Sequence, residues 1–323
     1  MRTNYAVGVD VGGTLIAVGL VERKGRILKD AKLLTPKTGP FAVVDTIIDL
    51  VAEVTGGIHD SELAGIGIGI PGQIDFQRQS IEFCTNLPLA GVDMRSLVMS
   101  RTKREVTIDN DGNLAAFGEA RWGAAKGARD FLMLTLGTGV GGGMFLNGEP
   151  YRGSRGLAGE FGHVVVDLDG RPCPCGGKGH LEAYLGRPAL AELGREAAKT
   201  FRGREIVAAA GGNADAVTAE SVLLAAQRGD EVAREILLDA GTVLGRALVG
   251  FVNVFNPKLI VIGGGIGEAA DFMVERAAEV MRGEAMAGRR DVEVTQAVLG
   301  NDAGILGAAA LSFDEHDARG GMH

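Results

Sequence analysis

The chain has 323 residues and a mass of 33.5 kDa, more than one hydrophobic core usually serves, so we expect two domains. Hydrophobic residues make up 46% and charged residues 23%, which is typical of a soluble globular protein and gives no support for disorder. The net charge of −8 and the lack of a lysine- or arginine-rich run argue against nucleic acid or an anionic membrane as a partner.

The first lobe, expected over residues 1–120, begins with three strands and then alternates helix and strand. The strands are "YAVGVDV", "TLIAVGLVE" and "RILKDAKLLT", and glycine turns typical of hairpins join them. After Pro40, apolar residues recur at helical spacing through "FAVVDTIIDLVAEVTG", and "LAGIGIGIPG" follows as a buried strand. The strand "EVTIDN" leads into a helix over "GNLAAFGEARWG", so this lobe is α/β.

The second lobe, expected over residues 121–300, opens in the same way. The segment "DFLMLTLGTGVGGGMFLNGEPY" predicts a strand, a glycine turn and a second strand, with a hairpin turn at Asn147–Gly148. Helical patterns dominate 181–256, the strand "KLIVIGG" precedes a helix after Gly267, and "DVEVTQAVL" is a late strand. A last helix is expected at about 302–313, and the polar residues beyond it are expected to be frayed.

Glycine and threonine occupy a tight turn at the start of each lobe, in "DVGGT" (10–14) and "LGTGVGGG" (136–143). Glycine permits a positive φ, and exposed N–H groups beside a threonine hydroxyl form an anion-binding nest. Either turn alone fits an ordinary hairpin as well as it fits a phosphate-binding turn. The two turns together favour a ligand with a chain of phosphate groups. A third cluster, "IGGGIG" (262–267), suits either a plain strand-to-helix turn or backbone packed beneath a nucleotide base.

The tetrapeptide "NDGN" (110–113) stands between a predicted strand and a predicted helix. One interpretation is an Asx turn that caps the helix. The other makes Asp111 a general base that takes the proton from a substrate hydroxyl as its oxygen attacks a phosphoryl group.

Several motifs together resemble the ROK family of sugar kinases and repressors, in the actin-like ATPase superfamily. They are "DVGGT", "NDGN" followed by "AFGEA", "LTLGTGVGGG", "GEFGH", "CPCGGKGHLE" and "FNPKLIVIGGG", and they extend from Asp10 nearly to the last helix. The resemblance implies two ribonuclease-H-like lobes with an interlobe active-site cleft and a C-terminal helix that returns to the first lobe.

The resemblance also implies the role of each site residue. Asp10 is expected to help hold Mg²⁺, and Asp111 is expected to be the catalytic base. The residues expected to contact ATP are Gly12, Gly13, Thr14, Gly137, Thr138 and Gly139 at the phosphates and Gly263, Gly264 and Gly265 near adenosine. The residues expected to bind the sugar are Asn86, Asn110, Asp111, Glu160, His163 and Glu182. Carboxylates accept hydrogen bonds from vicinal hydroxyls, and an amide both donates and accepts them.

The loop "HVVVDLDGRPCPCGGKGHLE" (163–182) holds two of the chain's three cysteines and two of its five histidines. Two thiolates and two imidazoles are a complete tetrahedral ligand set, so we expect a structural zinc ion on His163, Cys173, Cys175 and His180. His180 stands where the ROK pattern usually has a third cysteine. The alternative is two reduced thiols in a tight turn, and Cys84 is expected to fill core space.

The leading prediction is an ATP-dependent glucokinase. Kinases for fructose, mannose, allose or N-acetylmannosamine share these motifs, and polyphosphate is an alternative phosphoryl donor. A sugar-responsive repressor is the alternative from another class, but the first predicted strand begins near Asn4, so we expect no DNA-binding domain before it. A sugar-binding protein without turnover is disfavoured because Asp10 and Asp111 are both present. The resemblance further suggests a homodimer or a dimer of dimers, and the absence of a signal peptide or a long apolar stretch predicts a cytoplasmic protein.

Overall fold

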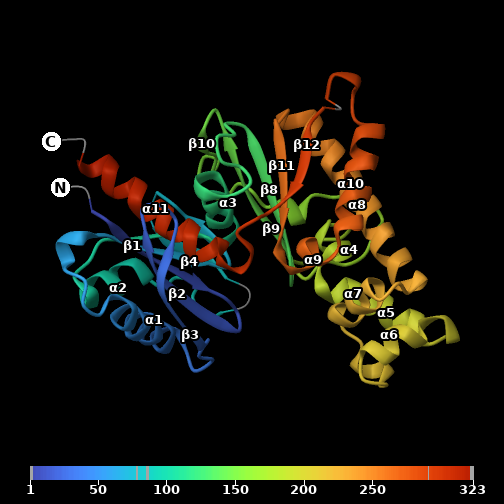
Figure 1. The fold of residues 1–323 in the computed structure, drawn as a ribbon, viewed down its shortest axis with the longest axis horizontal. Coiled ribbons are helices and arrows are strands. Elements are labelled where there is room, and N and C mark those ends of the chain that lie inside the picture. Colours follow the sequence, from blue (N-terminus) through green and yellow to red (C-terminus); the bar gives the residue numbers. More distant parts are fainter. Residues whose placement is uncertain (1–2, 78, 85–86, 290, 321–323) are drawn as a thin grey trace. The chain divides into compact units, whose positions relative to one another are not determined.

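The computed structural model describes residues 3–77, 79–84, 87–289 and 291–320. This part of the chain divides into two compact units. Unit 1 comprises Met1–Arg129, Gly143–Gly159 and Asn301–His323, and unit 2 comprises Asp130–Gly142 and Glu160–Gly300. Both units combine helices with strands of a five-stranded sheet, which confirms the predicted α/β class (Figure 1). Within the described ranges, no helix combines the length and apolar character that crossing a membrane requires.

A mixed sheet forms the centre of unit 1. Its strands are β1 (Tyr5–Val11), β2 (Leu15–Glu22), β3 (Ile27–Leu34), β4 (Leu63–Ile70) and β7 (Val106–Asn110), in the order β3-β2-β1-β4-β7. The pairs β1–β2 and β2–β3 are antiparallel, whereas β1–β4 and β4–β7 are parallel. The register places Asp10 beside Gly69 and Gly69 beside Asp109. The carboxyl ends of β1, β4 and β7 therefore lie at one edge of the sheet.

Helices and a hairpin complete unit 1. They are α1 (Pro40–Thr55), α2 (Met94–Thr102), α3 (Asp111–Trp122), α11 (Ala303–Gly320) and the hairpin of β5 (Gln73–Asp75) with β6 (Ser80–Phe83). Helix α1 starts with Pro40, a favoured first residue, and buries an apolar face that includes Val43, Ile47 and Leu50. The hairpin and α2 were not predicted. Cys84 is half-buried and packs against this core.

The C-terminal helix α11 packs against β1, β4 and α3 (Figure 1). Glycines make the close approach possible, because a Cβ atom built on Gly8 would lie 1.9 Å from the Ile305 carbonyl oxygen. One built on Gly67 would lie 1.9 Å from the Ala308 oxygen. The helix thus lies directly on the backbone of the two strands.

The predicted fraying is wrong for residues 314–320, since α11 continues to Gly320, and the last three residues of that prediction lie outside the described residues. Ion pairs hold this polar extension against the rest of unit 1. Asp314 pairs with Arg121, Asp317 with Arg23 at 2.8 Å, and Arg319 with Glu105 at 2.6 Å. The charges that suggested a solvated tail are the groups that anchor the helix.

The second sheet has the order β10-β9-β8-β11-β12. Its strands are β8 (Phe131–Leu136), β9 (Val140–Leu146), β10 (Glu149–Pro150), β11 (Leu259–Gly263) and β12 (Glu293–Gln296). The helices of unit 2 are α4 (Glu182–Leu185), α5 (Arg187–Ala198), α6 (Arg204–Ala209), α7 (Ala219–Gln227), α8 (Glu231–Phe255), α9 (Gly264–Ala269) and α10 (Asp271–Glu284).

One helix boundary in unit 2 differs from the prediction. The sequence predicts a helix after Gly267, but α9 begins at Gly264, immediately after β11. Gly264 has a φ of +81°, and a Cβ atom there would lie 2.4 Å from the Leu136 oxygen. The glycine cluster therefore permits a direct turn from strand to helix where the chain crosses β8.

Candidate functional site

The predicted residues of unit 1 gather at the carboxyl edge of its parallel strands. Asp10 lies near the end of β1, and Asp111 is the first residue of α3, immediately after β7. The Cα atom of Asp111 is 3.8 Å from the position of a Cβ atom on Gly69, which pairs with Asp10. Both carboxylates thus belong to the edge where open α/β sheets usually place their ligands.

The "NDGN" turn caps α3 through Asn110. Its side-chain oxygen accepts hydrogen bonds from the backbone N–H groups of Gly112 at 2.8 Å and Asn113 at 3.2 Å. Its amide nitrogen donates to the Gly72 oxygen at 2.8 Å. The Asx-turn interpretation is therefore correct for Asn110. The capped turn also presents Asp111 from the first residue of a helix.

Asp10 is a partly buried carboxylate whose pKa is raised above its ordinary value by that burial. In the described part of the chain, its side chain has no hydrogen bond or ion pair, and it lies against the first turn of α11. A Cβ atom on Gly304 would be 2.7 Å from the nearer Asp10 oxygen. Carboxylate oxygens are ligands that Mg²⁺ takes, together with several waters, so the side chain of Asp10 suits such a role.

The glycine turn between β1 and β2 is held from the far end of β3. Thr35 donates its hydroxyl to the Gly12 oxygen at 2.7 Å, and its backbone N–H donates to the Thr14 oxygen at 2.8 Å. The Lys37 ammonium group donates to the Gly13 oxygen. Lys37 was missed by the sequence analysis, and its positive charge gives the turn a second feature that suits an anion.

In unit 2, the structure brings Gly137–Gly139, Glu182 and Gly264 together. Glu182 accepts the backbone N–H of Val140 at 2.9 Å, and a Cβ atom on Gly139 would lie 2.2 Å from the same carboxylate oxygen. Gly264 packs on Leu136, which precedes the turn. A pocket of about 330 Å³ adjoins this group and is lined in part by Thr138, Glu182 and Arg171. The glycine turn is therefore tied both to a predicted sugar ligand and to the predicted adenosine cluster.

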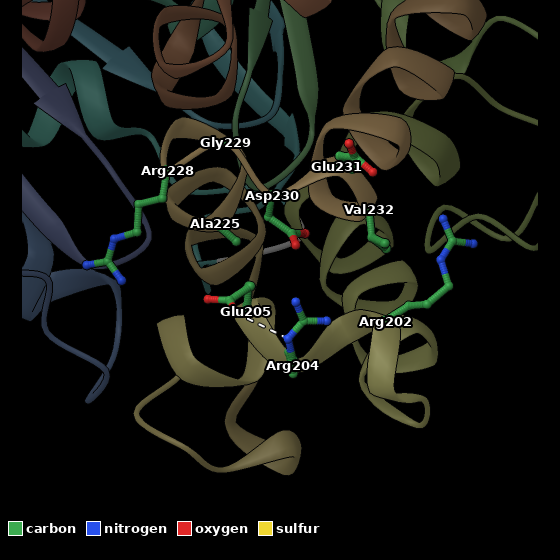
Figure 2. Close-up of a pocket in the computed structure, with 9 residues that line it drawn as sticks. All are labelled: Arg202, Arg204, Glu205, Ala225, Arg228, Gly229, Asp230, Glu231 and Val232. Atoms are coloured by element: carbon green, nitrogen blue, oxygen red, sulfur yellow. Dashed lines mark ion pairs between the residues drawn. The ribbon is translucent and has the colours of Figure 1, made fainter.

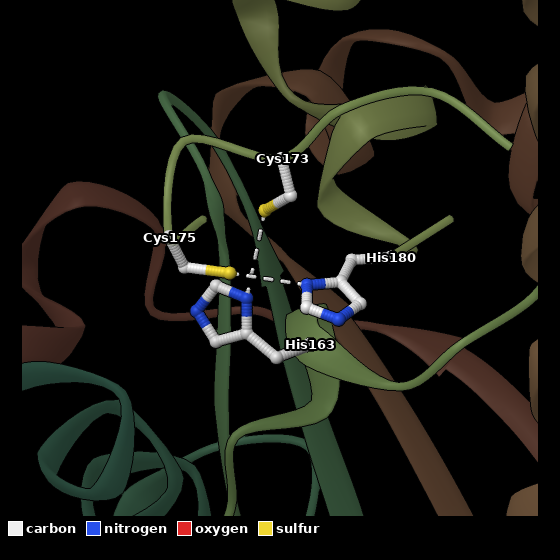
Figure 3. Close-up of side chains that lie close together, drawn as sticks. All are labelled: His163, Cys173, Cys175 and His180. Atoms are coloured by element: carbon white, nitrogen blue, oxygen red, sulfur yellow. Dashed lines mark hydrogen bonds between the residues drawn. The ribbon is translucent and has the colours of Figure 1, made fainter. Parts of the chain in front are cut away.

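The predicted metal ligands converge within unit 2. The ligand atoms of His163, Cys173, Cys175 and His180 all lie within 4.8 Å of one another. Figure 3 shows the two sulfur atoms and one nitrogen of each ring pointing toward a common centre. The Cys173 Sγ atom is 3.8 Å from His163 Nδ1, and the Cys175 Sγ atom is 3.2 Å from His180 Nδ1.

These distances suit a tetrahedral zinc ion. Zinc-to-sulfur and zinc-to-nitrogen bonds of ~2.3 and ~2.0 Å place neighbouring ligand atoms roughly 3.3–3.8 Å apart. The loop is shaped for this arrangement by short backbone contacts, in which Cys173 N–H donates to the Gly177 oxygen at 2.8 Å and Leu181 N–H to the Val164 oxygen at 3.0 Å. Burial raises the pKa of the Cys173 thiol, so a metal that binds there must displace its proton. The cluster is consistent with zinc.

His163 connects this cluster to Glu160. Its Nδ1 atom faces Cys173, whereas its Nε2 atom is 3.8 Å from a carboxylate oxygen of Glu160. Glu160 directly precedes the short 3₁₀ turn Phe161–His163, which ends at His163, and the His163 N–H donates to the Glu160 backbone oxygen at 3.0 Å. The ring thus has one nitrogen for a metal and another that faces a predicted sugar ligand.

A separate pocket of about 440 Å³ lies among α6, α7 and the start of α8. Figure 2 shows charged side chains of both signs around it, including the Arg204–Glu205 ion pair at 3.4 Å. Of the sequence-predicted site residues that the structure describes, none lines this pocket. The candidate site residues lie instead at the carboxyl edge of the unit 1 sheet and, in unit 2, around the turn Gly137–Gly139.

One predicted residue cannot be placed, and two residues near the site were not predicted. Asn86 lies outside the described residues. Asp109 and Arg152 were not predicted, yet they form an ion pair at 2.8 Å directly before the "NDGN" turn. Their separation by more than forty positions left no local pattern to detect.

Comparison with known proteins identifies the family. The ROK family profile matches residues 6–315. The glucokinase of Streptomyces coelicolor is 34% identical over 95% of this chain and 96% of its own length. The glucokinase of Thermotoga maritima is 36% identical over 94% and 96%. Two mixed sheets with these glycine turns define the class, an α/β protein with the fold of the ROK kinases. The chain belongs to the ROK family.

A solved relative resembles the chain in structure as well. A ROK family glucokinase from Streptomyces griseus, crystallised with glucose and AMPPNP, has a TM-score of 0.85 and 33% identity, and the match covers 95% of this chain and 98% of that one. The family resemblance also includes regulators. The xylose repressor of Bacillus subtilis is 29% identical over 97% of this chain and 78% of its own length.

Proposed function

We propose that this ROK-family sugar kinase transfers the γ-phosphoryl group of ATP to the 6-hydroxyl of glucose. The observation that carries the proposal is the match to a glucokinase crystallised with glucose and a nucleotide, at 33% identity over 95% of this chain. The matched relatives from Streptomyces coelicolor and Thermotoga maritima bear the same name. The proposal includes a cytoplasmic enzyme that forms homodimers or dimers of dimers.

Asp111 acts as the general base. Its carboxylate accepts the proton of the sugar hydroxyl while that oxygen bonds to the γ-phosphorus and the bond to the ADP oxygen breaks. Asp111 is the first residue of α3, and the Asn110 cap fixes the backbone of this turn. This fixed position supports the role of general base. Sugar hydroxyls bind to Asn86, Asn110, Glu160, His163 and Glu182.

The glycine turns bind the phosphates of ATP. In each turn the first N–H is used internally, since Gly12 donates to the Leu15 oxygen and Gly137 to the Gly139 oxygen. The later N–H groups of the turns Gly12–Thr14 and Gly137–Gly139 donate to phosphate oxygens, and Lys37 adds positive charge at the first turn. Gly263–Gly265 leave room for adenosine. Asp10 holds Mg²⁺, which neutralises phosphate charge when it is bound.

The metal cluster has a structural role. The residues His163, Cys173, Cys175 and His180 supply a closed set of protein ligands, and such a set gives zinc no open position for chemistry. The effect of the metal on the reaction is to hold the ring of His163 and, through it, the neighbouring Glu160.

A coupled assay with a sugar panel tests the proposal. Glucose, fructose, mannose, allose and N-acetylmannosamine are each offered with ATP, GTP or polyphosphate. We expect the highest kcat/KM for glucose with ATP. A higher value for another sugar or donor would replace the substrate in the proposal. Tight sugar binding by calorimetry without turnover would instead support a regulator.

A further inference from the structure

The carboxylate of Asp109 is fully buried at the end of β7, directly before the proposed catalytic turn. Its Oδ1 atom accepts hydrogen bonds from the Asn110 backbone N–H at 2.8 Å and from the Asn113 side-chain amide at 3.0 Å. These two donors stand on either side of Asp111. The buried carboxylate therefore binds both ends of the segment that carries the proposed base.

The other oxygen of Asp109 is bound by an arginine from a distant segment of unit 1. Arg152 Nε donates to Asp109 Oδ2 at 2.8 Å, and the arginine side chain is only 14% exposed. Its guanidinium group lies 3.8 Å from the ring centroid of Phe76 and 5.3 Å from that of Phe117. The cation is thus held between a carboxylate and two aromatic rings.

The segment that carries Arg152 is itself fixed. Its backbone oxygen accepts the N–H of Ala158 at 3.0 Å, which closes a short loop. Gly156 has a φ of +85°, and a Cβ atom there would lie 2.6 Å from the Phe76 nitrogen. This loop therefore packs tightly on the β5–β6 hairpin, and that packing holds the backbone that carries Arg152.

Stability alone is a weak reason for this pair. Desolvation of two charges offsets most of their attraction, and Arg152 Nη2 is buried with no hydrogen-bond partner among the residues that the structure describes. A pair that contributes little to folding but fixes the geometry of a neighbouring segment suits a positioning role.

We propose that Arg152 is a positioning residue for phosphoryl transfer, which acts by holding Asp109 and through it the segment Asn110–Asn113. This inference rests on the proposed role of Asp111 as general base. Displacement of a catalytic group by about 1 Å lowers turnover by up to ~10²-fold. Loss of Arg152 therefore acts on the rate through Asp111 and not through ATP binding.

The test is a double-mutant cycle with Arg152→Met and Asp111→Asn. Methionine keeps an unbranched apolar stem on Phe76 but removes the guanidinium group. Measured well below the melting temperature, Arg152→Met should lower kcat by about 10- to 100-fold, with little change in KM for ATP. In the Asp111→Asn background, the same change should lower kcat less than about twofold, because residues that act through one another are not additive.

Arg101→Met is the matched control, since Arg101 forms an exposed ion pair with Asp45 in the same unit. It should leave kcat unchanged. If Arg152→Met folds poorly, the double variant Asp109→Asn/Arg152→Met removes both buried charges and should still show a lowered kcat. Arg152→Lys keeps the charge and should recover part of the rate.

Hydrogen exchange at the Gly112 and Asn113 amides provides a readout that needs no activity. Arg152→Met should accelerate it at least about tenfold relative to Arg101→Met. Unchanged exchange would overturn the inference whatever the enzyme phosphorylates. Faster exchange with an unchanged kcat, in an enzyme that Asp111→Asn inactivates, would overturn the positioning role and leave the proposed function standing. If Arg152→Met lowered kcat by the same factor in the unmodified protein and in Asp111→Asn, the positioning role would also be overturned and the proposed function would stand.

Discussion

Asp111 is the single residue on which the proposed chemistry depends most directly. Asp111→Asn keeps the shape of the side chain but cannot accept a proton, so we expect kcat to fall at least ~10²-fold while sugar affinity changes little. Steady-state rates and calorimetric titration with glucose measure the two effects. Asp45→Asn, on the exposed face of α1, is the control and should be active. A variant at 111 with near-normal turnover would remove this residue from the catalytic role.

Asp10 couples function to stability through its pKa. Burial raises the pKa of Asp10 above its ordinary value of 3.8, so the ionised carboxylate lowers the free energy of unfolding. A group whose pKa is higher in the folded state contributes stability below its unfolded pKa, and this contribution is lost as pH rises through the folded value.

Asp10→Asn removes the buried negative charge that lowers the free energy of unfolding at neutral pH. Without Mg²⁺, we therefore expect the variant to be more stable than the unmodified protein at pH 7 and equally stable near pH 3. Urea unfolding at both values measures the difference, and kinase activity should fall in the same variant. A difference in the free energy of unfolding that did not change with pH would contradict the explanation.

At the level of elements, the loop that holds the Cys/His cluster connects a metal to predicted sugar ligands. Cys175→Ala should lose zinc and weaken sugar binding more than ATP binding, because the ring of His163 faces both Cys173 and Glu160. His180→Cys restores the usual family ligand and should keep both zinc and activity. Elemental analysis and calorimetry give the two readouts.

Cys84→Ala is the matched control for the zinc variants. Its thiol lies outside the cluster and donates to the Pro71 oxygen at 2.9 Å. Zinc content should not change. A fully active protein with far less than one zinc per chain would refute the role given to the cluster, and so would unchanged sugar affinity in Cys175→Ala.

The packing of α11 on the first sheet leads to a second prediction at this level. Gly67→Ala places a Cβ atom 1.9 Å from the backbone oxygen of Ala308, which no rotamer change relieves. We expect a loss of about 1–3 kcal/mol in the free energy of unfolding. Gly250→Ala, on the exposed face of α8 with open space around it, should instead gain about 0.5–1 kcal/mol. Chemical denaturation compares them, and equal effects would contradict this account.

At the scale of the whole molecule, segments that are far apart in the chain belong to the same unit. Unit 1 takes its last helix from the end of the chain, and Ile305, Leu311 and Phe313 of that helix are buried in it. A chain that ends at Gly300 should therefore lose cooperative folding of unit 1 while unit 2 keeps its zinc. Hydrogen exchange in β1 and β4 and metal analysis measure the two outcomes. Full protection of both strands in the truncated chain would show that α11 is dispensable.

The sequence by itself determined most of the strands and helices, and the family. Alternating apolar residues and glycine turns are local signals, so the strands of both sheets and the Cys/His cluster could be read from neighbouring positions. The loop 163–182 is the clearest case, because ligand chemistry and short spacing need no distant partner. The same local signals could not reveal the hairpin of β5 and β6, whose short strands carry little periodicity.

Only the tertiary structure decided which distant groups meet. The extension of α11 to Gly320 forms ion pairs with Arg23, Glu105 and Arg121, each roughly two hundred residues or more away along the chain. The Asp109–Arg152 pair and the approach of Gly67 to Ala308 are equally invisible in sequence. The physical reason is that burial and ion pairing depend on atoms in space, whereas periodicity and turn chemistry depend on neighbours in the chain.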